Sequence, residues 1–197
     1  MCGRYYVSEE MKSELEKIVA DLDKKINGIS FQGDVVPSAN ALILASGPRD
    51  QVAAKACRWG YQTNFSKRLL INARAETVNE KKLFASSLET ARCVIPAAGF
   101  YEWDAAKNKF SFMDKSKPVL YMAGLYRKEE DMEHFVIITT AANSSMEKIH
   151  NRMPLILDEK QMKDWLYHRM AAESLIRMIP PELKSSIDNE QIGLEFY

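Results

Sequence analysis

The stretches VLYMAGLY at residues 119–126 and FVIITT at residues 135–140 decide the fold class of this chain. Both are short apolar runs rich in β-branched and aromatic residues, a composition typical of buried strands. Comparable runs recur along the chain, at residues 3–7, 41–45, 52–59, 69–71, 93–95 and 155–157. A Gly47-Pro48 turn makes 52–59 the antiparallel partner of 41–45, and we expect Pro96 to end the strand at 93–95. The runs together predict an antiparallel, meander-like series of strands.

Helices are expected where apolar residues recur at helical spacing. Ser8 caps the first, whose apolar stripe runs from Met11 to Ile26 before Asn27-Gly28 ends it. A later helix begins at Asp158, which forms a capping box with Gln161, and its apolar face extends to Met170. Shorter helical pieces are expected at residues 80–84, 144–149 and 172–178.

The size and charge of the chain restrict its class. With 197 residues and 46% hydrophobic content, residues 1–197 can bury one core and form one domain. Lys plus Arg equals Asp plus Glu at 27 each, which excludes a protein that coats DNA through a global positive field. Any nucleic-acid binding must therefore come from a local cluster of basic side chains.

Cysteine and histidine usage indicates a reduced, cytoplasmic protein without a metal. The three cysteines form no CxxC pair, and neither a signal peptide nor an apolar run of membrane-spanning length is present, so no membrane partner is expected. The three histidines lack metal-ligand spacing, both among themselves and with the cysteines. We expect neither a metal nor another cofactor.

The first residues, Met1-Cys2-Gly3-Arg4, carry the most distinctive chemistry. Removal of Met1 would give Cys2 a free α-amine beside its thiol, and both groups are nucleophiles near neutral pH. An aldehyde can be captured by such a pair as a Schiff base and closed by the sulfur into a thiazolidine. The alternative is that Cys2 is a small apolar residue at the start of a strand.

Three further strings accompany Cys2-Gly3-Arg4: NARAET at residues 72–77, GFYEW at 99–103 and HNRMP at 150–154. Together the four resemble the SRAP family, the SOS-response-associated peptidases now understood as abasic-site DNA–protein cross-linking proteins. The resemblance extends from residue 2 to about residue 157, with the strings in family order, while the tail at 182–197 stays unassigned. It implies an α+β fold, a single domain with an antiparallel β-barrel-like core flanked by helices.

The resemblance also implies a function: covalent capture of abasic sites in single-stranded DNA, which shields the lesion in the SOS response. Cys2 matches the family nucleophile, Asn72 the amide beside it, Glu102 the catalytic carboxylate and His150 the histidine of its string. The chemistry asks for such groups, because a closed abasic sugar must be opened to its aldehyde and protons must move through carbinolamine and imine. His150 suits ring opening, and Glu102 suits proton exchange with the Cys2 amine. Individually, a lone Glu or His is more often a solvent-facing or structural residue.

DNA contacts are implied at positions near the four strings. Arg4, Arg74 and Arg152 would bind phosphates with their bidentate forks, although each alone is more often an ion-pair partner. Trp59 would stack on a base, with a core tryptophan as the equal alternative. Pro37 and Ser38 match a family loop near the DNA. Lys82 stands where an arginine is expected from the family. The partner is single-stranded DNA containing abasic sites, bound by a monomer.

Two other classes of function remain open. In an N-terminal-nucleophile amidohydrolase or peptidase, the Cys2 thiolate would attack an acyl carbon with its own amine as base. In a non-catalytic single-strand binder, Cys2→Ala would leave DNA retention unchanged. The resemblance adds strand cleavage by a lyase step and release of the protein's own N-terminal residue as possible side activities. Tyr61-Gln62-Thr63 departs from the family's usual Leu-Ile-Pro after Trp-Gly, so the wall on the DNA side can differ.

Overall fold

Five strands close a barrel at the centre of the computed structural model, which describes residues 2–19, 22, 29–64 and 66–187. They are β3 (Asn40–Ser46), β4 (Val52–Trp59), β8 (Arg92–Ala97), β11 (Leu120–Glu129) and β12 (Met132–Ala141). Their order is β12-β4-β3-β8-β11, and pairing of β11 with β12 closes the ring. All pairs are antiparallel except β4 with β12, which is parallel. The α+β fold with a β-barrel core is confirmed.

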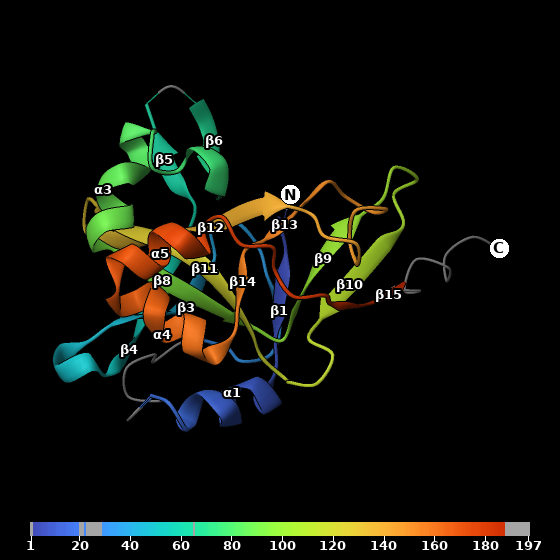
Figure 1. Cartoon of the computed structure of the whole chain (residues 1–197), viewed down its shortest axis with the longest axis horizontal. Helices are drawn as coiled ribbons and strands as arrows, with labels where there is room; N and C mark the ends of the chain where they lie inside the picture. The colour runs from blue at the N-terminus through green and yellow to red at the C-terminus, as the bar shows by residue number, and fades with distance from the viewer. Residues whose placement is uncertain (1, 20–21, 23–28, 65, 188–197) are drawn as a thin grey trace.

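A second, antiparallel sheet lies on the opposite side of the barrel from the helices α3 (Lys82–Thr90), α4 (Glu159–Tyr167) and α5 (Arg169–Leu175) (Figure 1). Its order is β15 (Lys184–Ile187), β10 (Lys109–Met113), β9 (Gly99–Trp103), β1 (Tyr5–Val7) and β2 (Gly33–Val35). The pairing of β15 with β10 gives part of the previously unassigned tail a place in this sheet, and residues 188–197 lie outside the described residues.

Shorter strands extend the barrel sheet toward the candidate site. β13 (Arg152–Pro154) and β7 (Asn72–Arg74) both pair with β12, and β14 (Ile156–Leu157) pairs with β11. A separate hairpin consists of β5 (Tyr61–Thr63) and β6 (Ser66–Leu70). The single-turn helices are η1 (Pro48–Asp50) and η2 (Ala75–Thr77).

Within the described ranges, α-helices with defined bounds pack on this framework at four places, and two of their predicted caps are confirmed. α1 (Glu9–Glu16) begins where the Met11 N–H donates to Ser8 Oγ at 3.3 Å. α4 (Glu159–Tyr167) begins with the Asp158 and Gln161 capping box. The remaining two are α3 (Lys82–Thr90) and α5 (Arg169–Leu175).

Several predicted boundaries are wrong. α1 ends at Glu16, because the Lys17 N–H turns back to the carbonyl of Glu14 and tightens the last turn; the expected end at residues 26–28 lies outside the described residues. The helix expected at 80–84 begins at Lys82 and runs longer. Met170, expected on the apolar face of the Asp158 helix, belongs to α5 and is 76% exposed.

Two further predictions fail for local reasons. Residues 144–149 form turns instead of a helix, because the N–H groups of Met146 and Ile149 bond to carbonyls three residues back and those of Glu147 and His150 to the same two carbonyls four residues back, so no continuous helical ladder forms. β8 continues through Pro96 to Ala97. Its pairing with β3 stops at Val94, so the N–H that Pro96 lacks interrupts no bond to β3.

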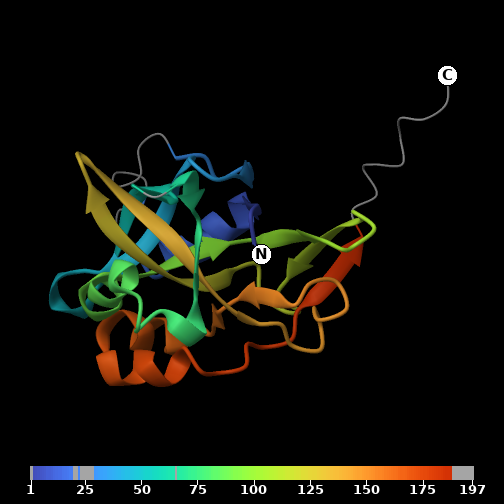
Figure 2. The ribbon, with the colours of Figure 1, turned by 90° about the horizontal axis from the view of Figure 1, so that it is seen from above.

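Two apolar clusters divide the core. The first lies beneath the helices and includes Trp165, whose indole N–H donates to the Cys93 carbonyl at 2.9 Å. The second joins the barrel to the five-stranded sheet and includes Cys2, Trp59 and Phe100. Figure 2 shows the arrangement from above, with α4 and α5 at one end of the molecule and β10 and β15 at the other. Cys2 is therefore part of the core on the side of the five-stranded sheet.

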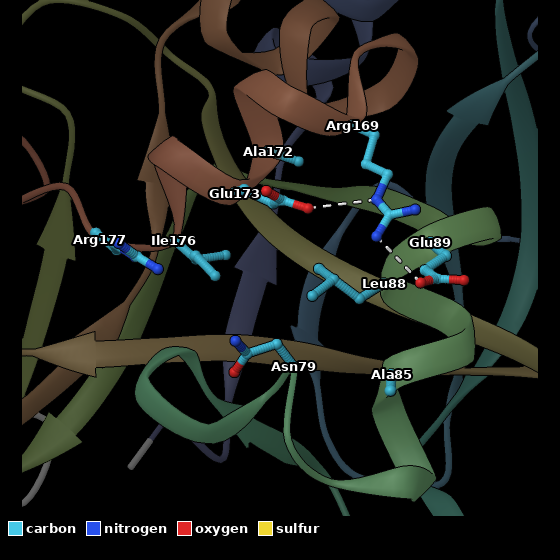
Figure 3. Close-up of a pocket in the computed structure, with 9 residues that line it drawn as sticks. All are labelled: Asn79, Ala85, Leu88, Glu89, Arg169, Ala172, Glu173, Ile176 and Arg177. Atoms are coloured by element: carbon cyan, nitrogen blue, oxygen red, sulfur yellow. Dashed lines mark hydrogen bonds and ion pairs between the residues drawn. The ribbon is translucent and has the colours of Figure 1, made fainter.

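The helices on the other side are held partly by charged groups. The Arg92 guanidinium donates to carbonyls at the C-terminal ends of both α3 and α4, including Leu88 at 2.8 Å and Trp165. Arg169 bridges Glu89 at 3.2 Å and Glu173 at 3.3 Å across a small cavity between α3 and α5 (Figure 3). This cavity lies among the helices, whereas Cys2 belongs to the apolar cluster of the sheet side.

Candidate active site

The pairing of β1 with β9 brings Glu102 to Cys2. Tyr5 is opposite Phe100, and the Tyr101 N–H donates to the Arg4 carbonyl at 3.0 Å. Antiparallel continuation of this register sets the residues before Arg4 beside those after Tyr101. The Glu102 side chain is only 5% exposed, and its charge acts on the Cys2 thiol. A buried carboxylate thus lies next to Cys2.

Asn72 reaches the same point from the barrel. Parallel pairing with β12, Ile137 opposite Asn72, holds β7 in place. The Asn72 amide is buried, and its Nδ2 donates to the Cys2 carbonyl at 3.0 Å. The Oδ1 atom of Asn72 is buried without a hydrogen bond in the described part of the chain. Three of the four predicted catalytic residues therefore converge.

The Cys2 thiol is in an unusual environment for a nucleophile. It has no exposed surface, and its Sγ has the Arg4 carbonyl at 3.9 Å. Burial, reinforced by the negative charge of Glu102, raises the pKa of Cys2 to about 12. The thiol is therefore protonated at neutral pH, and the thiolate is not the resting form.

His150 follows a series of turns and leads into β13. Its Nδ1 atom lies 2.9 Å from the Arg152 nitrogen and 3.2 Å from the Arg152 carbonyl oxygen. Ile149 and Met153, on either side, pack in the same apolar cluster as Cys2. In Figures 1 and 2 the start of β1 lies next to β13. The fold thus brings the histidine string to the cysteine's side of the barrel.

The three predicted phosphate-binding arginines differ in how much of their forks is available. Arg74 is exposed where β7 ends. Arg4 is 41% exposed, pairs with Asp34 at 3.3 Å and lies over the Trp103 ring at 5.9 Å. Arg152 is only 14% exposed, and both of its terminal nitrogens bond within the protein, to Glu76 and to the Thr139 carbonyl. The fork predicted to bind phosphate is occupied at Arg152 by a carboxylate.

Trp59 is not available to a DNA base, so the base-stacking prediction is wrong for this conformation. The side chain is fully buried, its indole N–H donates to the Ile71 carbonyl at 3.1 Å, and its ring packs on Phe135 and Tyr5. The core alternative describes it correctly. Its backbone still shapes the surface, because the Trp59 carbonyl accepts from the Ser38 N–H at 2.9 Å.

The remaining predicted DNA-binding residues lie on the surface. Pro37 and Ser38 form a turn, and Ser38 has a left-handed φ of 73°. The Ser38 carbonyl accepts from Arg58 Nε at 3.0 Å, which brings another cation to this loop. Lys82 is exposed at the first position of α3.

Sequence reasoning assigned no role to two residues that the structure connects to the site. Glu76 lies within the NARAET string but its partner, Arg152, is far away in the chain. The Tyr5 hydroxyl is buried without a hydrogen-bond partner in the described ranges, and burial together with the nearby Cys2 and Cys93 raises its pKa well above the usual value. The alternation of β1 could have predicted that Tyr5 and Tyr6 face opposite sides, but not what Tyr5 contacts.

Metal clusters and membrane-spanning helices are both absent from the described residues. Among residues 2–19, 22, 29–64 and 66–187, no three or more His, Cys, Asp and Glu side chains gather as metal ligands would. Within the same ranges, no helix combines the length and the apolar character needed to cross a membrane.

The closed barrel, the sheet that carries Cys2 and the four strings define a member of one family. The chain belongs to the SOS response associated peptidase (SRAP) family, whose model matches residues 1–193. The chain is 35% identical over 180 residues to abasic site processing protein YoqW of Bacillus subtilis (strain 168), covering 84% of this chain and 80% of that protein. It is 27% identical over 187 residues to abasic site processing protein YedK of Escherichia coli (strain K12), covering 88% and 82%.

Solved structures share the fold. A crystal structure of a protein from Bacteroides thetaiotaomicron superposes with a TM-score of 0.79 at 22% identity, over 96% of this chain and 93% of that one. A phage-related protein from Bordetella bronchiseptica gives a TM-score of 0.77 at 22% identity, over 96% and 95%. At this identity the likeness establishes the fold alone.

Proposed function

We propose that this protein processes abasic sites by capturing them covalently in single-stranded DNA through Cys2, once Met1 has been removed, and so shields the lesion. The relatives named as abasic site processing proteins support the substrate. The family description, SOS response associated peptidase, supports a role in the response to DNA damage.

One observation carries the proposal: the hydrogen bond from Asn72 Nδ2 to the Cys2 carbonyl, at 3.0 Å, with Glu102 buried beside the thiol. An amide fixes the backbone of the cysteine, and a carboxylate lies within reach of its reacting groups. A structural cysteine at the start of a strand would also need a partner for its buried carbonyl, but it would need no carboxylate buried beside its thiol. A 1,2-aminothiol that condenses with an aldehyde needs such a group to move protons.

The reaction begins with the sugar. His150 moves a proton to open the closed abasic sugar, which frees the aldehyde. The Cys2 amine adds to the aldehyde carbon to form a carbinolamine, which loses one water to give the imine. The Cys2 sulfur then bonds to the imine carbon while the thiol proton is transferred to nitrogen, with Glu102 as the carrier, and the thiazolidine ring closes.

The state of the Cys2 thiol supports this order of events. With a pKa raised to about 12, the thiol is a poor thiolate source at neutral pH, so the amine is the first nucleophile. An N-terminal hydrolase would instead need a lowered thiol pKa for attack on an amide. A protonated resting thiol is thus compatible with aldehyde capture that begins at the amine, while lyase cleavage and release of Met1 are side reactions of the same site in this proposal.

The DNA path follows from which side chains are exposed. Arg74 at the end of β7 and Arg4 on the sheet are the arginines available to phosphates, and the loop of Pro37 and Ser38 brings Arg58. Trp103, beneath Arg4, is only partly buried and takes over the base-stacking role that Trp59 cannot fill.

Intact mass spectrometry tests the proposal. The protein is incubated with a single-stranded oligonucleotide that contains one abasic site, in parallel with an undamaged oligonucleotide. We expect a species whose mass equals the protein without Met1 plus the oligonucleotide minus one water. If the wild-type protein formed no such species, covalent capture would be refuted. If Cys2→Ala formed it at equal yield, capture through Cys2 would be refuted.

A further inference from the structure

A carboxylate outside the predicted set ties two halves of the candidate site together. Glu76, in η2, follows directly on the strand that carries Asn72. Its two oxygens bind the two terminal nitrogens of Arg152, with Oε2 to Nη2 at 2.9 Å. Arg152 Nη2 also donates to the Thr139 carbonyl at 2.6 Å. The Asn72 string and the His150 string are therefore joined by a two-point ion pair across β12.

This ion pair is not a typical surface contact. Exposed pairs contribute little because both partners stay hydrated. Here the Arg152 side chain is only 14% exposed, and its Nε is buried without a hydrogen bond within the described ranges. Removing Glu76 would leave a largely buried cation with fewer partners, a situation that drives side chains to rearrange. Glu76 itself is 48% exposed, so it can be changed without opening the core.

The backbone of Arg152 in turn holds the imidazole of His150. The Arg152 N–H lies 2.9 Å from Nδ1, and the Arg152 carbonyl oxygen lies 3.2 Å from the same atom. A neutral ring accepts from the N–H, which leaves its own proton on Nε2. A charged ring carries a proton on Nδ1 as well and can donate it to the carbonyl. The Arg152 N–H therefore favours the neutral ring with its proton on Nε2, and the Arg152 carbonyl is an acceptor for the Nδ1 proton of the charged ring once that proton turns away from the N–H.

We propose that Glu76 is a positioning residue for His150: by holding the Arg152 side chain, it fixes the Arg152 backbone against Nδ1 and so directs Nε2 toward the sugar. The inference rests on the proposed function for its chemical meaning. Glu76 touches no reacting atom. Its part is to keep Nε2 aimed at the sugar: the ring takes up a proton at Nδ1, becomes charged, and then gives its Nε2 proton to the ring oxygen of the sugar.

The opposite role for this pair makes a distinct prediction. If Glu76 only occupied a fork that DNA phosphate must take over, its loss would free Arg152 for the DNA. Glu76→Gln would then bind single strands more tightly, with a steeper salt dependence, and would capture every substrate at least as fast. A positioning role predicts slower capture of one substrate class.

The first arm of the test compares capture rates by denaturing gel. Glu76→Gln is assayed on an oligonucleotide with a closed abasic sugar and on one whose acyclic linker ends in a free aldehyde. Since a well-placed acid or base contributes about 10²–10⁴-fold, we expect at least a tenfold loss on the closed sugar. We expect less than a twofold change on the free aldehyde, and partial recovery in Glu76→Asp. Glu173→Gln is the matched control, because Glu173 is also 48% exposed and pairs with an arginine, Arg169, on the far helices (Figure 3).

The second arm does not depend on activity. The ¹⁵N shifts of the His150 ring in the isolated protein report which nitrogen carries the proton. We expect one Nε2–H tautomer in wild type and in Glu173→Gln, and a mixture of tautomers in Glu76→Gln. An unchanged tautomer in Glu76→Gln, or equal slowing of both substrates, would overturn the inference. If wild type forms no adduct, the proposed function fails, and the tautomer result alone decides the role of Glu76.

Discussion

Trp59→Phe separates a core role for this residue from a DNA-binding role. The substitution removes the indole N–H that bonds the Ile71 carbonyl, but that carbonyl keeps the Ile137 N–H at 3.1 Å, so no acceptor is left unsatisfied. The lost hydrogen bond therefore contributes about 1 kcal/mol. The smaller ring leaves a void of roughly 40 Å³, which adds about 1 kcal/mol at ~24 cal/mol per Å³.

The sum, about 2 kcal/mol, lowers the Tm by roughly 4–8 °C for a domain of this size. Because Trp59 has no exposed surface, we expect the affinity for single-stranded DNA to stay within about twofold of wild type. Thermal unfolding followed by circular dichroism measures the first quantity, and fluorescence anisotropy with a labelled oligonucleotide measures the second.

Trp103→Ala is the matched comparison, since Trp103 is only partly buried and lies beneath Arg4. It should change the Tm little and weaken DNA binding, because a stacked base is worth about 1–3 kcal/mol. If Trp59→Phe weakened binding strongly while its Tm stayed at the wild-type value, Trp59 would have to leave the core to meet DNA, and our reasoning would be wrong.

Three other experiments test the site, and a fourth tests the pH dependence of stability. The wild-type adduct should survive a denaturing gel without borohydride, since a thiazolidine is a closed ring; a strict need for reductant would mean that only an imine forms. Arg74→Ala should lower the salt slope of single-strand binding by about 0.7, the value for one phosphate contact, and an unchanged slope would place the DNA elsewhere. His150→Ala should slow capture of a closed sugar but hardly that of a free aldehyde, whereas Glu102→Gln should slow both; equal slowing by His150→Ala would contradict its ring-opening role. Burial in the folded protein raises the pKa of the Cys57 thiol to about 12. In the unfolded chain the same thiol loses its proton near the usual pKa of about 8.5. The free energy of unfolding should therefore fall as the pH rises above about 8.5. Cys57→Ala should flatten this alkaline decline in urea titrations.

Much of the fold could be predicted because strands and helix starts depend on neighbouring residues. The run expected at 52–59 is β4 residue for residue, and the run at 41–45 lies within β3. Ser8 and Asp158 cap helices as expected, since a cap bonds N–H groups within three residues of it. The errors came where strand pairing or isolated turns outweighed the pattern, as at Pro96 and at residues 144–149.

The sequence by itself determined which groups are available for chemistry: a cysteine at position 2, an amide, a carboxylate and a histidine in four recognisable strings. Only the tertiary structure decided which of them meet. Asn72 reaches Cys2 because β7 pairs with β12, and Arg152 faces Glu76 because β13 pairs with the same strand. Such contacts depend on strand register between segments about 70 residues apart, which no local periodicity encodes. For the same reason, Trp59 could be read as a base-stacking residue until the barrel closed around it.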